Sequence, residues 1–103
     1  MPTIGQPYTK GTWTVREGSE EEFVERWKEL IGSAREVPGA ESFLLIQERN
    51  DPRRFVSFGA WSDWESADAW RAGPAFTEAM RACLELCEDF QPGDSTLRAA
   101  VPT

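Results

Sequence analysis

The chain has 103 residues, the length of one small domain, and carries 11 Lys and Arg against 18 Asp and Glu, a net charge of −7. It has no histidine, which excludes Ser-His-Asp and Cys-His catalysis and His-ligated zinc or haem. An acidic chain is also a poor partner for nucleic acid or an anionic membrane, because both attract basic surfaces. We therefore expect no nucleic-acid or membrane partner and a function that resides in a pocket.

Hydrophobic residues make up 40% of the chain and aromatic residues 12%, which is typical of a folded globular domain. The N-terminus has no charged and apolar leader, and no window reaches the ~18 apolar residues of a membrane span, so we expect a cytoplasmic protein. The two cysteines, Cys83 and Cys87, lie four residues apart in a helical pattern. This spacing favours buried structural thiols over a disulfide or a metal site.

After a short lead at residues 1–7, residues 8–15 are rich in β-formers and predict a first strand. Ser19 and Glu22 have the spacing of a capping box and predict the start of a helix. The apolar face of this helix has the helical period and consists of Phe23, Trp27, Leu30, Ile31 and Ala34. A Val-Pro-Gly sequence at 37–39 ends it.

Residues 42–49 and 55–61 predict two further strands, joined as a hairpin by a turn at 50–53. Both strands are apolar on either parity, whereas two helices cover only one face of a sheet. In a chain of this length the second face is most simply covered by a second copy. The sequence therefore predicts a homodimer formed through the sheets.

Ser62 and Asp63 are both candidate caps for a short helix that ends at Gly73. Pro74 restarts the helix, and its apolar face continues to Cys87. A last strand is predicted at 96–101. The order β-α-β-β-α-β is that of an α+β, ferredoxin-like fold with an antiparallel sheet.

Small residues alternate with tryptophans on one face of two predicted strands: Gly11 with Trp13, and Ser57 and Gly59 with Trp61. If both faces lie under the helices, these residues form a hollow walled by Trp13 and Trp61, with Trp70 as its lid. A mostly apolar hollow with few polar groups is typical of a small-ligand site. The alternative is that the glycines only allow close packing of large aromatic residues.

Few polar residues are candidates for chemistry. Tyr8, the one phenol, is either a strand-edge residue or a group that hydrogen-bonds a ligand or transfers a proton. Arg53, Arg54 and Arg71 are expected on the solvated surface, with anion binding as the alternative. The sequence has no glycine-rich phosphate loop and no flavin or nicotinamide motif. We therefore expect no cofactor and no metal.

Four sequence features together resemble the antibiotic biosynthesis monooxygenase superfamily. They are the Val-Pro-Gly turn at 37–39, Trp61, the Trp-Glu-Ser run at 64–66 and the AWRAGPAF break at 69–76. The resemblance covers residues 8–101 and implies one domain over 1–103 with the fold of a dimeric α+β barrel. It also implies a pocket between the sheet and the helices. Members include oxygenases that oxidise aromatic polyketides or quinols without flavin or metal, with the substrate carbanion or enolate supplying the electron to oxygen.

Two branches of that superfamily give expectations for single residues. In the quinone-forming polyketide branch, a third-strand Trp matches Trp61, and the position of an Asn is occupied here by Ser57. A serine hydroxyl is shorter than an amide and cannot span the same carbonyl. In the haem-degrading branch, the positions of an Asn, a Trp and a His resemble Gly11, Trp70 and Met80. Because only the Trp is kept, no haem is expected.

The resemblance therefore implies a cofactor-independent monooxygenase that acts with O2 on a phenolic, quinol or anthrone-like aromatic substrate. The expected catalytic residues are Trp61, Ser57 and Tyr8, and the expected substrate-binding residues are Trp13, Trp70, Gly11, Gly59, Met80 and Phe76. The alternative is a small-molecule binder, isomerase or cyclase of the same fold. The missing histidine and asparagine favour this alternative, because general acid or base chemistry near neutral pH would need a strongly shifted carboxylate or tyrosine.

Overall fold

The computed structural model describes residues 3–103, so the first two residues of the expected lead lie outside the described part. The elements are β1 Pro7–Val15, α1 Glu20–Ala34, β2 Ala40–Gln47, β3 Arg54–Trp61, α2 Trp64–Ala72, α3 Pro74–Leu84 and β4 Cys87–Thr96. This order confirms the predicted ferredoxin-like α+β class. The region expected to hold a helix, a break and a restarted helix forms α2 and α3.

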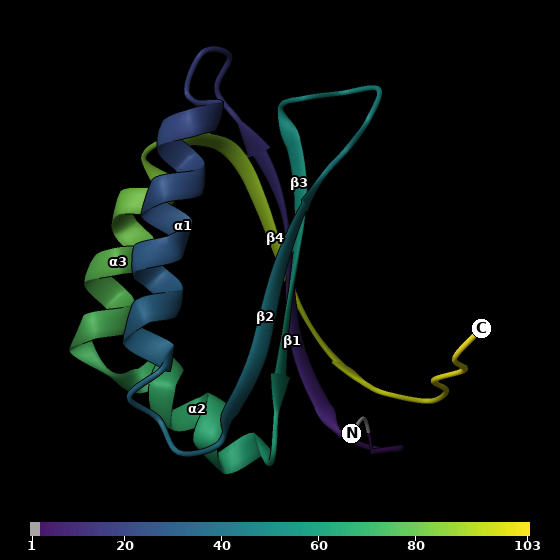
Figure 1. Ribbon diagram of the computed structural model, residues 1–103. Coiled ribbons are helices and arrows are strands. Elements are labelled where there is room, and N and C mark those ends of the chain that lie inside the picture. The colour runs from purple at the N-terminus through teal and green to yellow at the C-terminus, as the bar shows by residue number, and fades with distance from the viewer. Residues whose placement is uncertain (1–2) are drawn as a thin grey trace.

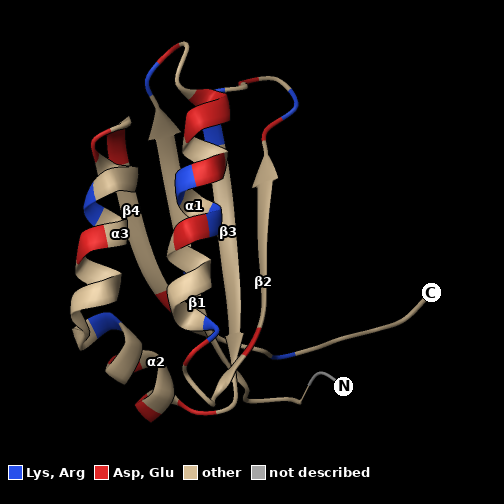
Figure 2. Ribbon diagram, turned by 60° about the vertical axis from the view of Figure 1, so that its left-hand side comes forward, with Lys and Arg blue, Asp and Glu red and all other residues tan. Residues whose placement is uncertain are grey.

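The four strands form one antiparallel sheet in the order β2-β3-β1-β4. All three helices lie on the same face of this sheet, and the opposite face carries no layer of the described chain (Figure 1). Charged residues are concentrated on the helices and on the loops at the strand ends, while β1, β2 and β3 carry few of them (Figure 2). The sheet thus has one face under the helices and one open face.

Local chemistry accounts for the helix starts. The Asp63 carboxylate accepts a hydrogen bond from the Ser66 N–H at 2.7 Å and caps α2, and this bond is the main reason that the pKa of Asp63 is lowered. The expected capping box at Ser19 does not form, because the Ser19 side chain makes no cap bond. The Glu20 carboxylate instead accepts from the Gly18 N–H at 2.8 Å, and Gly18 has a φ of +90° that favours glycine.

The expected last strand at 96–101 is wrong. The strand spans Cys87–Thr96 and pairs with β1 along its whole length, from Val15 opposite Cys87 to Pro7 opposite Thr96. Cys87 consequently opens a strand and does not belong to the helix. Asp89, Pro92 and Gly93 disfavour strand structure, but an edge strand tolerates proline because one side of it needs no partner.

The core lies between the helices and the covered face of the sheet. Trp61 and Phe23 are fully buried, and Trp13 is 2% exposed. The aromatic rings contact one another in a chain, with Trp61 and Trp70 at 5.3 Å between centroids and Trp13 and Phe23 at 5.1 Å. Such tilted aromatic pairs add to the stability gained by burying their area.

Candidate functional site

A cavity of about 110 Å³ lies between the sheet and the helices. Its floor is formed by Thr9 and Gly11 of β1 and Ser57 and Gly59 of β3. Its walls are largely aromatic and aliphatic: Trp13, Trp27, Leu30, Ile31, Phe43, Trp70, Phe76, Met80, Phe90 and Pro92. Among the described residues, Arg71 is the ionisable side chain of the lining, because the Lys10 side chain lies on the open face of the sheet beside Gly93. A site of this kind suits a flat, apolar ligand with few polar groups.

Most of the residues expected in the pocket do line this cavity: Ser57, Gly11, Gly59, Trp13, Trp70, Phe76 and Met80. Two do not. Trp61 does not line the cavity; its ring packs against those of Trp70 and Phe43, at 5.3 and 5.5 Å between centroids, and these two residues do line it. Tyr8 points to the open face of the sheet, because its neighbour Thr9 faces the cavity and side chains alternate along a strand.

Sequence reasoning missed several lining residues. Thr9 shares a strand face with Gly11, so the period of two already placed it beside the expected hollow. Phe90 had no usable signal, because the strand that carries it was expected elsewhere in the chain. Phe43 lies opposite Gly59 in the register of β2 and β3, a pairing that no sequence pattern fixes.

Both floor glycines make room for aromatic rings. A Cβ on Gly11 would stand 2.6 Å from Phe90 Cε1, and one on Gly59 would stand 2.5 Å from Phe43 Cε2. These distances are far below van der Waals contact. The alternative stated from the sequence, that the glycines allow close packing of large aromatic residues, therefore holds for Phe90 and Phe43. A cavity nevertheless remains beside these rings.

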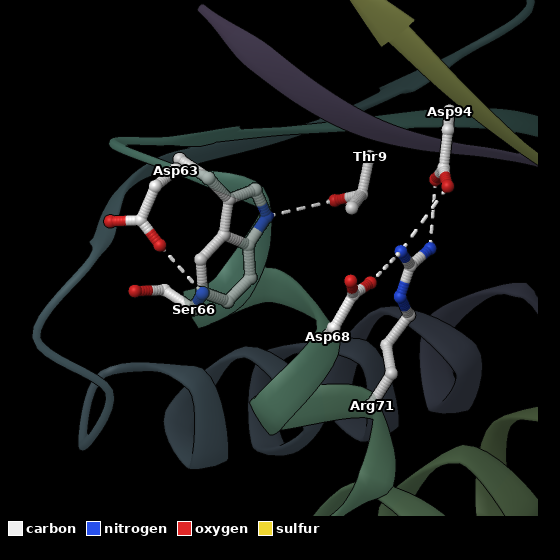
Figure 3. Close-up of polar contacts among 7 residues, drawn as sticks. Thr9, Asp63, Ser66, Asp68, Arg71 and Asp94 are labelled. Carbon is white, nitrogen blue, oxygen red and sulfur yellow. Dashed lines mark hydrogen bonds and ion pairs between the residues drawn. The ribbon is translucent and has the colours of Figure 1, made fainter.

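The tryptophan indoles donate to hydroxyl groups around the cavity. Trp13 Nε1 donates to Ser57 Oγ at 3.0 Å. Trp61 Nε1 donates to Thr9 Oγ1 at 3.1 Å, and Figure 3 shows this second bond as the dashed line that ends at Thr9. Ser57 is 8% exposed and Trp13 is 2% exposed, so the first pair is shielded from water. Within residues 3–103, no buried side-chain nitrogen or oxygen lacks a hydrogen-bond partner.

An ion pair connects α2 with β4 beside the cavity. The Arg71 guanidinium donates to both carboxylate oxygens of Asp94, at 2.8 and 3.2 Å, and to Asp68 at 3.0 Å (Figure 3). The bond to Asp94 is the main reason that the pKa of Arg71 is raised. Arg71 therefore remains charged and already has anionic partners.

The lining offers no group for general base catalysis near neutral pH. It contains no carboxylate, phenol or thiol among the residues that the structure describes. Burial raises the pKa of Cys83 to about 12 and that of Cys87 to about 11. The same part of the chain holds no group of three side chains able to bind a metal ion, and none of its helices is long and apolar enough to cross a membrane.

The chain belongs to the antibiotic biosynthesis monooxygenase family. The sequence profile of that family matches residues 9–82, well over half of the chain and including both strands of the cavity floor. No curated protein sequence matches the chain significantly.

Several solved structures share the fold. SnoaB from Streptomyces nogalater, a cofactor-independent oxygenase, is 22% identical, with a TM-score of 0.87 over 96% of this chain and 99% of SnoaB. A protein from Shewanella oneidensis is 22% identical, with a TM-score of 0.78 over 92% of this chain and 93% of its own. A conserved protein from Methanosarcina mazei is 18% identical, with a TM-score of 0.82 over 92% and 95%. At these identities the likeness establishes the fold alone.

Proposed function

We propose that the cavity binds a small electron-rich aromatic molecule and that the chain is a cofactor-independent monooxygenase acting on a phenolic, quinol or anthrone-like substrate. The observation that carries this proposal is the aromatic cavity with two hydroxyl groups, Ser57 and Thr9, on its floor. Membership of the monooxygenase family and the fold shared with the oxygenase SnoaB support it.

For an anthrone-like substrate, the reaction converts a ring CH2 group into a carbonyl. The substrate first loses a proton from that carbon, and the resulting carbanion gives an electron to O2. One oxygen atom of O2 becomes the new carbonyl oxygen, and the other leaves as water with the two hydrogens of the CH2 group. The four electrons taken up by O2 all come from the substrate carbon, so the reaction balances with substrate and O2 alone.

The residues of the cavity would bind and shield the substrate more than they exchange protons with it. Ser57 and Thr9 would hydrogen-bond the ionised oxygen of the substrate, which stabilises the enolate or phenolate form. Trp13, Trp70 and Phe76 would enclose the ring and exclude water. Trp61 would act as a positioning residue through its bond to Thr9.

The size of the cavity limits what it encloses. An engineered apolar cavity of about 150 Å³ takes up benzene, so a cavity of about 110 Å³ encloses one aromatic ring at most. A larger ring system would place one ring over the floor and extend the others past the half-exposed side chains of Phe76 and Met80.

The alternative function is a small-molecule binder, isomerase or cyclase of the same fold. The observation in its favour is the lack of a carboxylate, phenol or thiol in the lining, since an enzymatic deprotonation usually relies on such a group. Oxygen consumption separates the two functions, because only the oxygenase uses O2.

The open face of the sheet supports the proposal of a homodimer. Leu44 and Ile46 of β2 are 63% and 54% exposed, and Val56 and Phe58 of β3 are half-buried beside them. A contiguous apolar patch of this kind is typical of an interface. A second copy facing this patch would cover it with the same residues, as a two-fold dimer requires.

We further propose that the protein acts in the cytoplasm.

The experiment that tests the function is oxygen consumption by the purified protein, without added flavin or metal, over a panel of anthrones, hydroxynaphthalenes and quinols. The heat-inactivated protein is the control. Uptake above this control on any of these substrates is the expected result and identifies the substrate class. Background uptake on the whole panel would overturn the monooxygenase and favour the binder or isomerase.

A further inference from the structure

The cavity floor is built from a short sequence pattern that occurs twice. A hydroxyl residue, a glycine and a tryptophan follow one another at alternate positions in Thr9-Lys10-Gly11-Thr12-Trp13 of β1 and again in Ser57-Phe58-Gly59-Ala60-Trp61 of β3. Because side chains alternate along a strand, the three pattern residues of each strand share the face under the helices.

The antiparallel register places the two patterns head to tail. Thr9 lies opposite Gly59, and Gly11 lies opposite Ser57. The four residues thus form the corners of a square, with the hydroxyl groups on one diagonal and the glycines on the other. A local two-fold axis through the centre of the square relates β1 to β3. Residues on such a diagonal are about 7–8 Å apart.

The tryptophans complete this symmetry. The indole of each strand crosses to the hydroxyl group of the other, from Trp13 to Ser57 at 3.0 Å and from Trp61 to Thr9 at 3.1 Å. An indole N–H is a donor only, so each hydroxyl oxygen accepts in its bond. Within residues 3–103, neither hydroxyl group donates its own hydrogen to a protein acceptor. Each therefore keeps an O–H donor for a ligand.

Ser33 provides a contrast within the same chain. Its hydroxyl oxygen accepts from Trp70 Nε1 at 2.9 Å, as those of Thr9 and Ser57 accept from their tryptophans. Its hydrogen, however, is donated to the backbone carbonyl of Leu30 at 2.6 Å, and Ser33 does not line the cavity. Ser33 thus fixes an indole and keeps no donor for a ligand.

We propose that the Thr9 and Ser57 hydroxyl groups form a symmetric pair of hydrogen-bond donors that selects a planar ring with an acceptor oxygen, carbonyl or phenolate, on each of two opposite edges. This inference rests on the proposed binding of an aromatic molecule in the cavity and deepens it. It makes Thr9 a specificity-determining residue. A ring that lies between the Phe43 and Phe90 rings, which cover the two glycines, with its oxygens toward the two hydroxyl corners, satisfies both donors and follows the local two-fold axis.

The test compares two planar ligands of similar outline, one with oxygens and one without. Duroquinone carries two carbonyl oxygens on opposite edges of a tetramethylated six-membered ring, and durene is the tetramethylbenzene with hydrogens at those two positions. Equilibrium dialysis measures the affinity of both for the wild-type protein and for Thr9→Val, Ser57→Ala and Ser33→Ala. The Ser33→Ala variant is the matched control, because it also removes a hydroxyl that accepts from an indole.

We expect wild-type protein to bind duroquinone more tightly than durene. Thr9→Val and Ser57→Ala should each weaken duroquinone binding about threefold to tenfold, the worth of one neutral hydrogen bond, and leave durene binding unchanged. Ser33→Ala should leave the affinity for both ligands unchanged. Thr9→Ser and Ser57→Thr, which keep a hydroxyl group, should retain the preference for duroquinone, and the two Thr9 variants suffice if Ser57→Ala fails to fold.

Three results would overturn the donor pair: equal affinity of the wild-type protein for both ligands, parallel losses of durene and duroquinone affinity in Thr9→Val, or a loss in Ser33→Ala as large as in Ser57→Ala. Failure of the proposed function is recognised separately, by oxygen uptake. Oxygen uptake in a protein with no preference for duroquinone would reject the donor pair alone. A donor-dependent preference without oxygen uptake on the panel would reject the monooxygenase alone.

Discussion

Phe90 occupies the space that a side chain on Gly11 would need, with its Cε1 atom 2.6 Å from the position of a Cβ there. The same virtual Cβ would stand 3.1 Å from Trp13 Nε1. The glycine therefore lets the Phe90 ring and the Trp13 indole, which are 4.2 Å apart between centroids, lie against the sheet. Because Phe90 belongs to the edge strand β4 and lines the cavity, the packing of β4 at Gly11 also determines the shape of the cavity.

Gly11→Ala should destabilise the fold by about 1–3 kcal/mol, because the added methyl group overpacks this contact and forces the Phe90 ring to move. The displaced ring narrows the cavity, so duroquinone binding should weaken as well. Urea unfolding followed by tryptophan fluorescence measures the free energy of unfolding. An unchanged free energy would contradict the tight packing at Gly11.

Gly32→Ala is the matched control for this substitution. Gly32 lies in α1, and a Cβ there would meet nothing within 4 Å. Alanine should therefore raise the free energy of unfolding by about 0.5–1 kcal/mol through its better helix propensity. Opposite signs for the two glycine variants would separate the effect of packing from that of backbone entropy.

Ser57→Ala tests the worth of the buried bond to Trp13. Removing the hydroxyl group leaves the Trp13 N–H, which is 2% exposed as a residue, without its acceptor. We expect a loss of about 1–3 kcal/mol in the free energy of unfolding. In a Trp13→Phe background the same substitution should cost less, because no indole N–H remains to be left unpaired. An equal cost in both backgrounds, measured as a double-mutant cycle, would show that the bond does not stabilise the fold.

The elements with strong local signals were predictable from the sequence, and those fixed by pairing were not. The helical period of Phe23, Trp27 and Leu30 predicted α1, and the Gly73-Pro74 sequence predicted the boundary between α2 and α3. The strand β4 was misplaced because its residues have low strand propensity and its position depends on pairing with β1.

The candidate site, too, was predictable where the pattern of a single strand determines it and not where tertiary packing does. Alternation along a single strand brought Gly11 and Trp13 together and likewise Ser57 and Gly59, and all four line the cavity. Alternation could not show how deep a side chain lies. Trp61 shares the inward face of β3 but does not line the cavity, whereas Phe43 and Trp70, whose rings pack against it, do line it, and this difference is set by tertiary packing.

Leu44→Lys tests the proposed homodimer. Leu44 is 63% exposed on the open face of the sheet, so a lysine there should leave the fold of one subunit intact while placing two charges in a two-fold interface. Sedimentation velocity at micromolar concentration should show a dimer for the wild-type protein and a monomer for this variant. Leu84→Lys is the control, because Leu84 is 41% exposed on α3, away from the sheet. A monomeric wild-type protein, or dissociation in both variants, would contradict the proposed interface.

Cys83 and Cys87 should be unreactive in the native protein. Burial raises the pKa of Cys83 to about 12 and that of Cys87 to about 11, so the reactive thiolate is almost absent near pH 9, where an ordinary thiol with a pKa of 9.0 is about half ionised. Ellman's reagent should label both thiols slowly in the native state and rapidly in denaturant. Rapid native labelling would contradict their burial.

The same shifts predict a loss of stability in alkali. Thiols whose pKa is raised by folding hold protons that the unfolded chain releases above the ordinary value of 9.0. The free energy of unfolding should therefore fall as the pH rises from 9.0 towards about 12. In Cys83→Ala, urea unfolding at a series of pH values should show a smaller fall over this range. If the free energy of unfolding fell equally in the wild-type protein and in Cys83→Ala, the loss of stability in alkali would be due to groups other than Cys83.

The pH dependence of oxygen uptake should follow the substrate and not the protein. Among the described residues, the ionisable side chain of the lining is Arg71, and pairing with Asp94 and Asp68 raises the pKa of Arg71 and keeps it charged. Because the lining holds no carboxylate, phenol or thiol to act as a base, uptake should rise with pH as the substrate itself ionises. Two substrates that differ in acidity should therefore give two different midpoints. One midpoint shared by both substrates would reveal a protein base and contradict a site that acts by binding and hydrogen bonding alone.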